Sequence, residues 1–135
     1  FNTSDSVGVI FCKSLKIPIA IITGEDTEIV KNRAKKLDIN LLFQGIKNKA
    51  EIAEKLINDL NIHWKDVAFI GDDIGDYELL KKAGVSCAPN NSSDYIKKIV
   101  DLVTKKNGGD GAFREFIEIL VGEERISELL NNQFV

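Results

Sequence analysis

The sequence predicts one α/β domain of the Rossmann-like class, in which a parallel sheet lies between two layers of helices. Short apolar segments alternate with amphipathic segments along the chain, as in parallel strands that are joined by helices. The chain has 135 residues and contains no internal repeat, low-complexity tract or linker-like break. A single domain spanning 1–135 therefore accounts for the whole sequence.

Four apolar segments are the expected strands, and they cover 17–22, 41–43, 67–70 and 85–88. The first is a near-continuous apolar run, which is typical of a strand that is buried on both faces of a parallel sheet. Ligands of such sheets bind beyond the carboxyl ends of the strands. The residues that follow each strand are therefore the candidates for a functional site.

Six amphipathic segments are the expected helices, and they cover 6–16, 26–37, 48–60, 77–83, 92–103 and 112–120. The second carries an apolar stripe that includes Ile29 and Ala34, the pattern of a helix with one face on the core. Gly84 follows the fourth helix and is a usual residue at a helix C-terminus.

Composition narrows the function classes. The net charge is −3 and the hydrophobic content is 44%, so we expect neither a nucleic-acid partner nor an acidic-membrane partner. The longest apolar run is far too short to cross a bilayer. Cys12 and Cys87 lack metal-site or redox-motif spacing and are expected to be buried thiols in a reducing compartment. We therefore expect a cytoplasmic protein.

An acidic cluster follows the third strand. Asp72, Asp73 and Asp76 lie at its carboxyl end, where neighbouring carboxylates repel each other unless a cation or hydrogen-bond donors compensate. Mg²⁺ prefers one or two carboxylates together with water and phosphate oxygens. The alternative is that these residues only cap the following helix and favour its positive end.

Two further strand ends carry groups that could hold an anion. Thr23 and Gly24 offer a hydroxyl and unhindered backbone N–H groups after the first strand, although Thr-Gly is also an ordinary turn. Lys49 lies in the first turn of a helix and on its apolar side, where the helix dipole disfavours a cation. It would be explained by a phosphate or by the aspartates, or it could be a lysine at the core margin. Arg33 also allows two interpretations. It could bind the carboxylate of a substrate, or it could lie along the edge of the core in an ion pair with a carboxylate of the protein.

Taken together, these motifs resemble motifs two, three and four of the haloacid dehalogenase superfamily. The resemblance is closest to its cap-less branch, which removes phosphate from sugar acids of eight or nine carbons. The resemblance rests on segment 1–6, Ile22-Thr23-Gly24, Phe43-Gln44-Gly45, the motif from Gly71 to Asp76, and Gly108 to Ala112 followed by Arg114-Glu115.

The resemblance implies a role for each motif. Thr23 and Lys49 would bind the transferring phosphoryl group, and Asp72 would be a Mg²⁺ ligand. Asp73 and Asp76 would support the metal site and position Lys49. The residues that would face the sugar acid are Asn2, Thr3, Ser4, Asp5, Ser6, Gly24, Glu25 and Arg33. A homotetramer is the expected assembly.

The sequence departs from the family pattern in two respects. The Asp-x-Asp of motif one, which carries the nucleophile, is expected before Phe1 and is absent, so the chain alone should be inactive. Glu25 and Asp110 also stand where octulosonate phosphatases usually have arginine. An acidic Glu25 favours a hydroxyl-rich or amino-bearing substrate tail, hence a nine-carbon acid 9-phosphate ahead of octulosonate 8-phosphate.

Two other functions compete with this hypothesis. Similar domains that have lost their catalytic aspartates serve as oligomerisation domains behind sugar-acid cytidylyltransferases. Retention of Asp72, Asp73, Asp76 and Lys49 argues against that reading, and the residues before Phe1 would decide it. A response-regulator receiver also combines an acidic pair, a threonine and a lysine, but in the reverse order along the chain.

Overall fold

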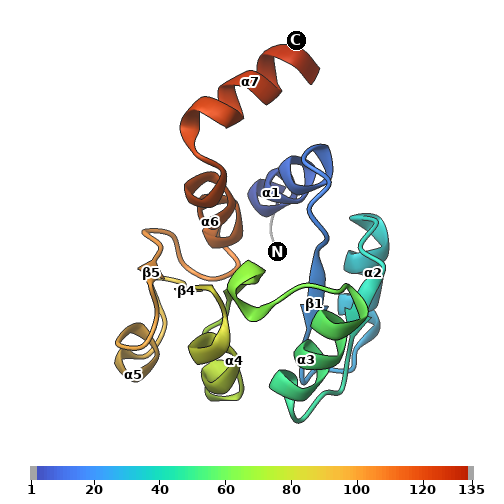
Figure 1. Cartoon of the computed structure of the whole chain (residues 1–135), viewed down its shortest axis with the longest axis vertical. Helices are drawn as coiled ribbons and strands as arrows, with labels where there is room; N and C mark the ends of the chain where they lie inside the picture. The colour runs from blue at the N-terminus through green and yellow to red at the C-terminus, as the bar shows by residue number, and fades with distance from the viewer. Residues whose placement is uncertain (1–2, 134–135) are drawn as a thin grey trace.

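The computed structural model describes residues 3–133, with side chains for 6–131. Helices and parallel strands alternate as the sequence predicts (Figure 1). The described elements are α1 (Thr3–Ser14), β1 (Ala20–Ile22), α2 (Glu28–Lys36), β2 (Leu41–Phe43), α3 (Lys49–Asp59), η1 (Trp64–Asp66), β3 (Ala68–Ile70), η2 (Ile74–Asp76), α4 (Tyr77–Lys82), β4 (Val85–Ala88), α5 (Asp94–Lys97), β5 (Leu102–Val103), α6 (Ala112–Val121) and α7 (Glu123–Gln133).

The strands form two parallel sheets. In one sheet β1 pairs with β2, with Ala20 opposite Leu41. The other has the order β3-β4-β5, with Ala68 opposite Val85 and Cys87 opposite Leu102. Within the described residues β1 and β3 each hydrogen-bond to a strand on one side only. The α/β class is confirmed, and the sheet is divided between its second and third strands in chain order.

The first strand is shorter and more exposed than expected. It begins at Ala20, and Ile17 is 45% exposed. Pro18 has no N–H to give to a strand partner, and β1 is paired only with β2. The prediction of a strand over 17–22 that is buried on both faces was therefore wrong in its extent and in its burial.

Segment 92–103 also differs from the prediction of one long helix. Its helical part is only α5, Asp94–Lys97, and the segment ends in strand β5. Just before β5, the Asp101 carboxylate accepts hydrogen bonds from the backbone N–H of Ser86 at 2.9 Å and from its hydroxyl at 3.2 Å. This bridge ties the segment to β4, so the following residues pair as a strand.

Three smaller corrections concern the helices. α1 begins at Thr3, so most of the segment expected before the first helix is part of it. α7 was not predicted. Ile29, assigned to a buried stripe, is 76% exposed, whereas Ala34 on the same helix is 1% exposed.

Helix packing divides the core into clusters. Val9 of α1, Ala34 of α2 and partly buried Phe113 of α6 share one cluster with β1 and β2 residues. α1 and α6 approach closely at Gly8, where an added Cβ would lie 3.0 Å from the Phe113 ring. Leu80 of α4 belongs to a separate cluster with β4 and α5. α3 and α4 lie side by side below α1 and α6, and α7 extends beyond the rest of the molecule (Figure 1).

In the part of the chain that the structure describes, no helix is long and apolar enough to span a membrane.

Candidate functional site

The centre of the candidate site is a buried ion pair. The Lys49 ammonium, at the first residue of α3, lies 2.7 Å from Asp76 Oδ1. The two side chains are only 13% and 5% exposed, respectively. The interpretation of Lys49 as a lysine whose ammonium escapes to water is therefore wrong, because Asp76 holds the cation inside the protein.

The second oxygen of Asp76 organises the loop after β3. Asp76 Oδ2 accepts hydrogen bonds from the backbone N–H groups of Asp72 and Asp73, both at 3.1 Å. A carboxylate with several charge-assisted bonds is strongly held in one position. Asp76 therefore fixes both the lysine and the backbone that carries the other two aspartates.

Gly71 makes this arrangement possible. A Cβ at this position would lie 2.7 Å from Asp76 Cγ, closer than side-chain carbons pack. Because Asp76 is anchored on both oxygens, it cannot move aside without losing those bonds. The glycine before the aspartates is thus required by the close approach of a buried side chain.

Asp72 and Asp73 have different environments from Asp76. Both are exposed. Asp73 Oδ1 accepts the Ile74 N–H at 2.7 Å and caps η2, so the capping alternative is right for Asp73 but describes only part of the cluster. Asp72 Oδ2 faces the loop after β5 and lies 3.5 Å from where a Cβ of Gly108 would be.

Thr23 follows β1 and is tied to the segment that leads into α3. Its backbone N–H donates to Phe43 O and its carbonyl accepts from Ile46 N–H, each at 3.0 Å. Its hydroxyl accepts the N–H of Glu25 at 3.1 Å. The loop is therefore a closed turn in which the Glu25 N–H is already bonded to Thr23. An anion bound here would have to accept hydrogen bonds from the Thr23 hydroxyl and from the other backbone N–H groups of the turn.

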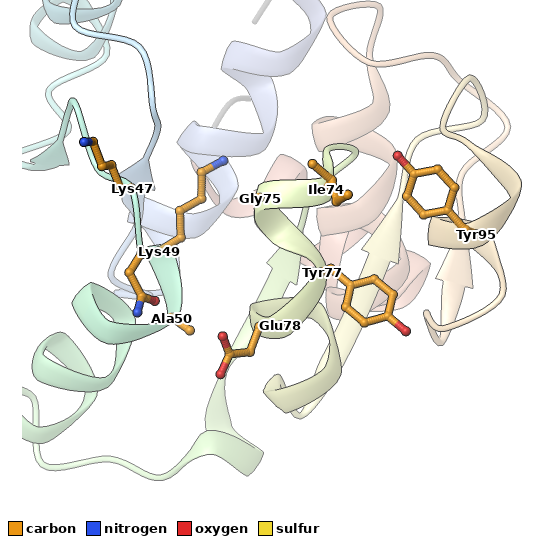
Figure 2. Close-up of a pocket in the computed structure, with 9 residues that line it drawn as sticks. Lys47, Lys49, Ala50, Ile74, Gly75, Tyr77, Glu78 and Tyr95 are labelled. Atoms are coloured by element: carbon orange, nitrogen blue, oxygen red, sulfur yellow. The ribbon is translucent and has the colours of Figure 1, made fainter.

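A cavity of about 570 Å³ adjoins Lys49. Figure 2 shows Lys47 and Lys49 on the α3 side and Ile74, Tyr77 and Tyr95 on the other. Its volume is within the usual range for small-ligand pockets. Its lining is Lys47, Asn48, Lys49, Ala50, Ile74, Gly75, Tyr77, Glu78 and Tyr95.

Most of these lining residues were missed by the sequence analysis. Ile74 and Tyr95 are 71% and 51% exposed. Exposed large side chains beside polar loops indicate a binding surface, but their exposure is known only from the structure. The available sequence signal was the spacing of Lys47 two residues before Lys49.

The residues expected to face a sugar acid are only partly described. Asn2 lies outside the described residues, and the side chains of Thr3, Ser4 and Asp5 do as well, although all three belong to α1. Ser6 is half-buried in α1, which packs mainly on α6.

Gly24, Glu25 and Arg33 are all exposed. Gly24 and Glu25 belong to the turn of Thr23. Arg33 lies five residues into α2, about 8 Å along the axis from its first residue. Its role, and that of the other sugar-acid residues, stays a prediction.

The donor set fits a Mg²⁺ site that is completed by other ligands. Within the described residues no group of three or more His, Cys, Asp or Glu side chains could by itself hold a metal ion. Mg²⁺ is usually bound through one or two carboxylates, with water and phosphate oxygens filling the other positions. Exposed Asp72 can supply one of these carboxylates, whereas Asp76 is engaged with Lys49.

The two cysteines are not candidates for catalysis. Burial raises the pKa of Cys12 to about 11. For Cys87, burial first and then the charge of Glu115 raise the pKa to about 12. Both thiols are buried and stay protonated at neutral pH, as the sequence predicted for structural cysteines.

A family model of haloacid dehalogenase-like hydrolases matches residues 12–116. The chain belongs to this family. The match includes the ends of β1 and β3 and the start of α3, which carry the proposed Thr23, Asp72 and Lys49 motifs. The sequence resemblance is thereby confirmed at the level of the family.

Individual relatives of this haloacid dehalogenase-like hydrolase point to one branch. The chain is 35% identical over 121 residues to 3-deoxy-D-manno-octulosonate 8-phosphate phosphatase of Escherichia coli, covering 90% of this chain and 64% of that protein. It is 31% identical to the enzyme of the same name from Haemophilus influenzae, covering 90% and 67%. The chain thus spans about two-thirds of the length of these curated relatives.

Solved structures agree with this fold. A probable YrbI family phosphatase from Pseudomonas syringae has a TM-score of 0.94 at 32% identity, over 100% of this chain and 77% of that one. The 3-deoxy-D-manno-octulosonate 8-phosphate phosphatase of Moraxella catarrhalis, in complex with magnesium, phosphate and KDO, has a TM-score of 0.91 at 31% identity, over 98% and 78%. The comparisons give no support to the cytidylyltransferase alternative.

Proposed function

We propose that this chain is part of a Mg²⁺-dependent phosphatase that hydrolyses the phosphate monoester of a sugar acid. The observation that carries the proposal is the buried Lys49–Asp76 pair, 2.7 Å long, whose aspartate also holds the backbone N–H of Asp72. This contact brings a cation and an exposed carboxylate to the same edge of the sheet. Phosphoryl transfer needs such positioning and charge neutralisation.

The residues of this chain would bind and orient the phosphate. Lys49 would neutralise phosphate charge, the Thr23 hydroxyl would donate to a phosphate oxygen, and Asp72 would be a ligand of Mg²⁺. When bound, Mg²⁺ stabilises the charge that develops on the transferring group. Asp73 and Asp76 keep the loop and the lysine in place.

The nucleophile would come from a segment that precedes Phe1. One aspartate oxygen attacks phosphorus, the sugar oxygen leaves and takes a proton from a second aspartate, and water then cleaves the aspartyl-phosphate. The edges of β1 and β3 that have no strand partner among residues 3–133 support this proposal, because a parallel strand between them would bring its carboxyl end to the edge that carries Thr23 and Asp72.

The substrate is proposed as an eight- or nine-carbon 2-keto-3-deoxy sugar acid. The curated relatives named above act on 3-deoxy-D-manno-octulosonate 8-phosphate. Glu25 is exposed in the turn of Thr23, where a carboxylate would repel a substrate carboxylate and accept hydrogen bonds from hydroxyl or amino groups. That charge favours the longer, hydroxyl-rich nine-carbon acid 9-phosphate.

Two further parts of the proposal follow from the family resemblance and from composition. The enzyme would be a homotetramer, which light scattering of the whole protein would test. It would act in the cytoplasm, on a small-molecule substrate, without nucleic-acid or membrane partners.

Phosphate release from a panel of eight- and nine-carbon sugar-acid phosphates tests the function. We expect turnover of the whole protein with Mg²⁺, loss of at least about 100-fold of the rate in excess chelator, and a similar loss in Asp72→Asn, because the phosphate charge is then unbalanced. Asp94→Asn, an exposed carboxylate on α5, is the matched control and should keep its rate. Equal turnover with and without chelator would refute the proposal.

A further inference from the structure

In the loop between β5 and α6, a side chain that follows β4 bonds to the glycine that lies beside the candidate ion ligand. The sequence 107–111 is rich in glycine and predicts only a flexible turn. In the structure the backbone N–H of Gly108 donates to Asn91 Oδ1 at 2.9 Å. Asn91 follows β4, the strand that lies between β3 and β5.

This arrangement places three neighbouring strand ends in contact. Asp72 follows β3, Asn91 follows β4, and Gly108 follows β5. A Cβ on Gly108 would lie 3.5 Å from Asp72 Oδ2 and 3.6 Å from Asn91 Oδ1. The backbone at Gly108 therefore lies beside the Asp72 carboxylate, and its hydrogen bond to Asn91 fixes its position there.

The start of the same loop is anchored from the other side. Glu115 of α6 accepts the backbone N–H groups of Lys105, at 2.8 and 3.1 Å, and of Lys106, at 3.0 Å. The carbonyl of Lys106 accepts the N–H of Asn90 at 3.0 Å. These bonds fix the first part of the loop, so the Asn91 contact decides the position of its glycine part.

We propose that Asn91 is a positioning residue for divalent-ion binding, acting through Gly108 on Asp72. The Asn91 side-chain amide keeps the backbone at Gly108 beside the Asp72 carboxylate. The nearby backbone limits the orientations that the Asp72 side chain can adopt and the space left for an ion beside it. This inference rests on the proposed function, in which Asp72 is a Mg²⁺ ligand. It goes beyond that function by assigning a role to a residue that touches neither ion nor phosphate.

The loop has a second consequence for anion binding. Because the Gly108 N–H is already bonded to Asn91, this glycine is not available to cradle a phosphate. The glycine at 108 serves close approach to Asp72 instead, and a bulky side chain there would enter the space beside the carboxylate.

The test compares Asn91→Ala with Asn90→Ala in the whole protein. Asn90 is the matched control, since its side chain makes a longer contact of 3.4 Å to Asn107 Oδ1 while its backbone bond survives the substitution. Mn²⁺ binding is measured by electron paramagnetic resonance, with Mg²⁺ as competitor, and exchange of the Gly108 amide is measured by NMR. Losing one hydrogen bond should weaken Mn²⁺ binding by about 3- to 10-fold in Asn91→Ala and speed Gly108 exchange by a similar factor.

The outcomes distinguish the positioning role of Asn91 from the proposed ion site at Asp72. Asn90→Ala should stay within about twofold of the wild type in both readouts, and Asn91→Asp, which keeps an acceptor oxygen, should retain slow Gly108 exchange. If Asn91→Ala binds Mn²⁺ as the wild type does while Asp72→Asn loses it, the positioning role is overturned and the ion site stands. If Asp72→Asn binds Mn²⁺ normally, the ion site itself is overturned, and the inference with it.

Discussion

Removing the charge of Asp76 tests the ion pair at the centre of the site. In Asp76→Asn the side chain keeps its shape and one acceptor oxygen, so the two N–H groups that now bond Oδ2 can still be satisfied. What is lost is the anion 2.7 Å from the ammonium of Lys49, whose side chain is only 13% exposed. Breaking a buried pair by removing one partner typically costs about 3–5 kcal/mol.

We expect the lower end of that range, about 3 kcal/mol, because the amide retains part of the network. Urea unfolding at pH 7, followed by the fluorescence of the single tryptophan, Trp64, and by circular dichroism, measures the free energy of unfolding. With a denaturant slope of about 1.5–2 kcal/mol per molar, the midpoint should fall by about 1.5–2 M.

Asp73→Asn is the matched control. It makes the same chemical change at an exposed aspartate three residues away, whose carboxylate only caps η2. Asparagine caps a helix about as well as aspartate, so this change should cost less than about 0.5 kcal/mol. If Asp76→Asn proves no more destabilising than Asp73→Asn, the buried pair does not hold Lys49 and the reasoning about the site is wrong.

Two further predictions concern stability away from the phosphate. Gly84→Ala should destabilise the fold by more than about 2 kcal/mol, because the new Cβ would collide with the Lys65 carbonyl, whose carbon would be 2.6 Å away. Thermal unfolding measures this loss. Gly24→Ala, whose new Cβ would have its nearest atom at 3.6 Å, is the control and should cost much less in the same measurement. The pKa values of Cys12 and Cys87 are raised from 9.0 to about 11 and about 12, so the stability from the protonated thiols is complete below pH 9 and declines as the pH rises towards these values. Unfolding midpoints between pH 8 and 10.5 should therefore fall more steeply in the wild type than in the Cys12→Ala/Cys87→Ala double variant, and parallel slopes would contradict the assigned shifts.

The strands and their polar ends could be predicted because their signals are local. An apolar run that is followed by Thr23, or by Gly71 and Asp72, identifies a strand and the edge at which it stops. Segment 92–103 could not be predicted in this way. Its helix ends at Lys97, and its later part is tied to β4 by the hydrogen bond that Asp101 accepts from Ser86, 15 residues earlier. A side chain that is satisfied across a sheet leaves no periodic signal in its own segment.

The candidate site shows the same limit. The presence of Lys49 on the apolar side of a helix predicts that it meets an anion, and the structure supplies Asp76. The need for Gly71 and the role of Asn91 were not predictable, because both depend on the distance between backbone and side chains from different loops. Sequence patterns thus identified the chemical groups but not the contacts that hold them in place.

The charges at the strand ends give a physical reason for a divalent ion. Asp72, Asp73 and Asp76 carry three negative charges and Lys49 carries one positive charge, so these four side chains together are negative by two. The charge of Lys49 is already paired with Asp76, since the two side chains lie 2.7 Å apart and are only 13% and 5% exposed. A phosphate dianion approaching the remaining exposed carboxylates would be repelled at short range. A divalent cation beside Asp72 would reverse the sign of that interaction, so the proposed phosphatase activity would depend on the ion and would not rest on Lys49 alone.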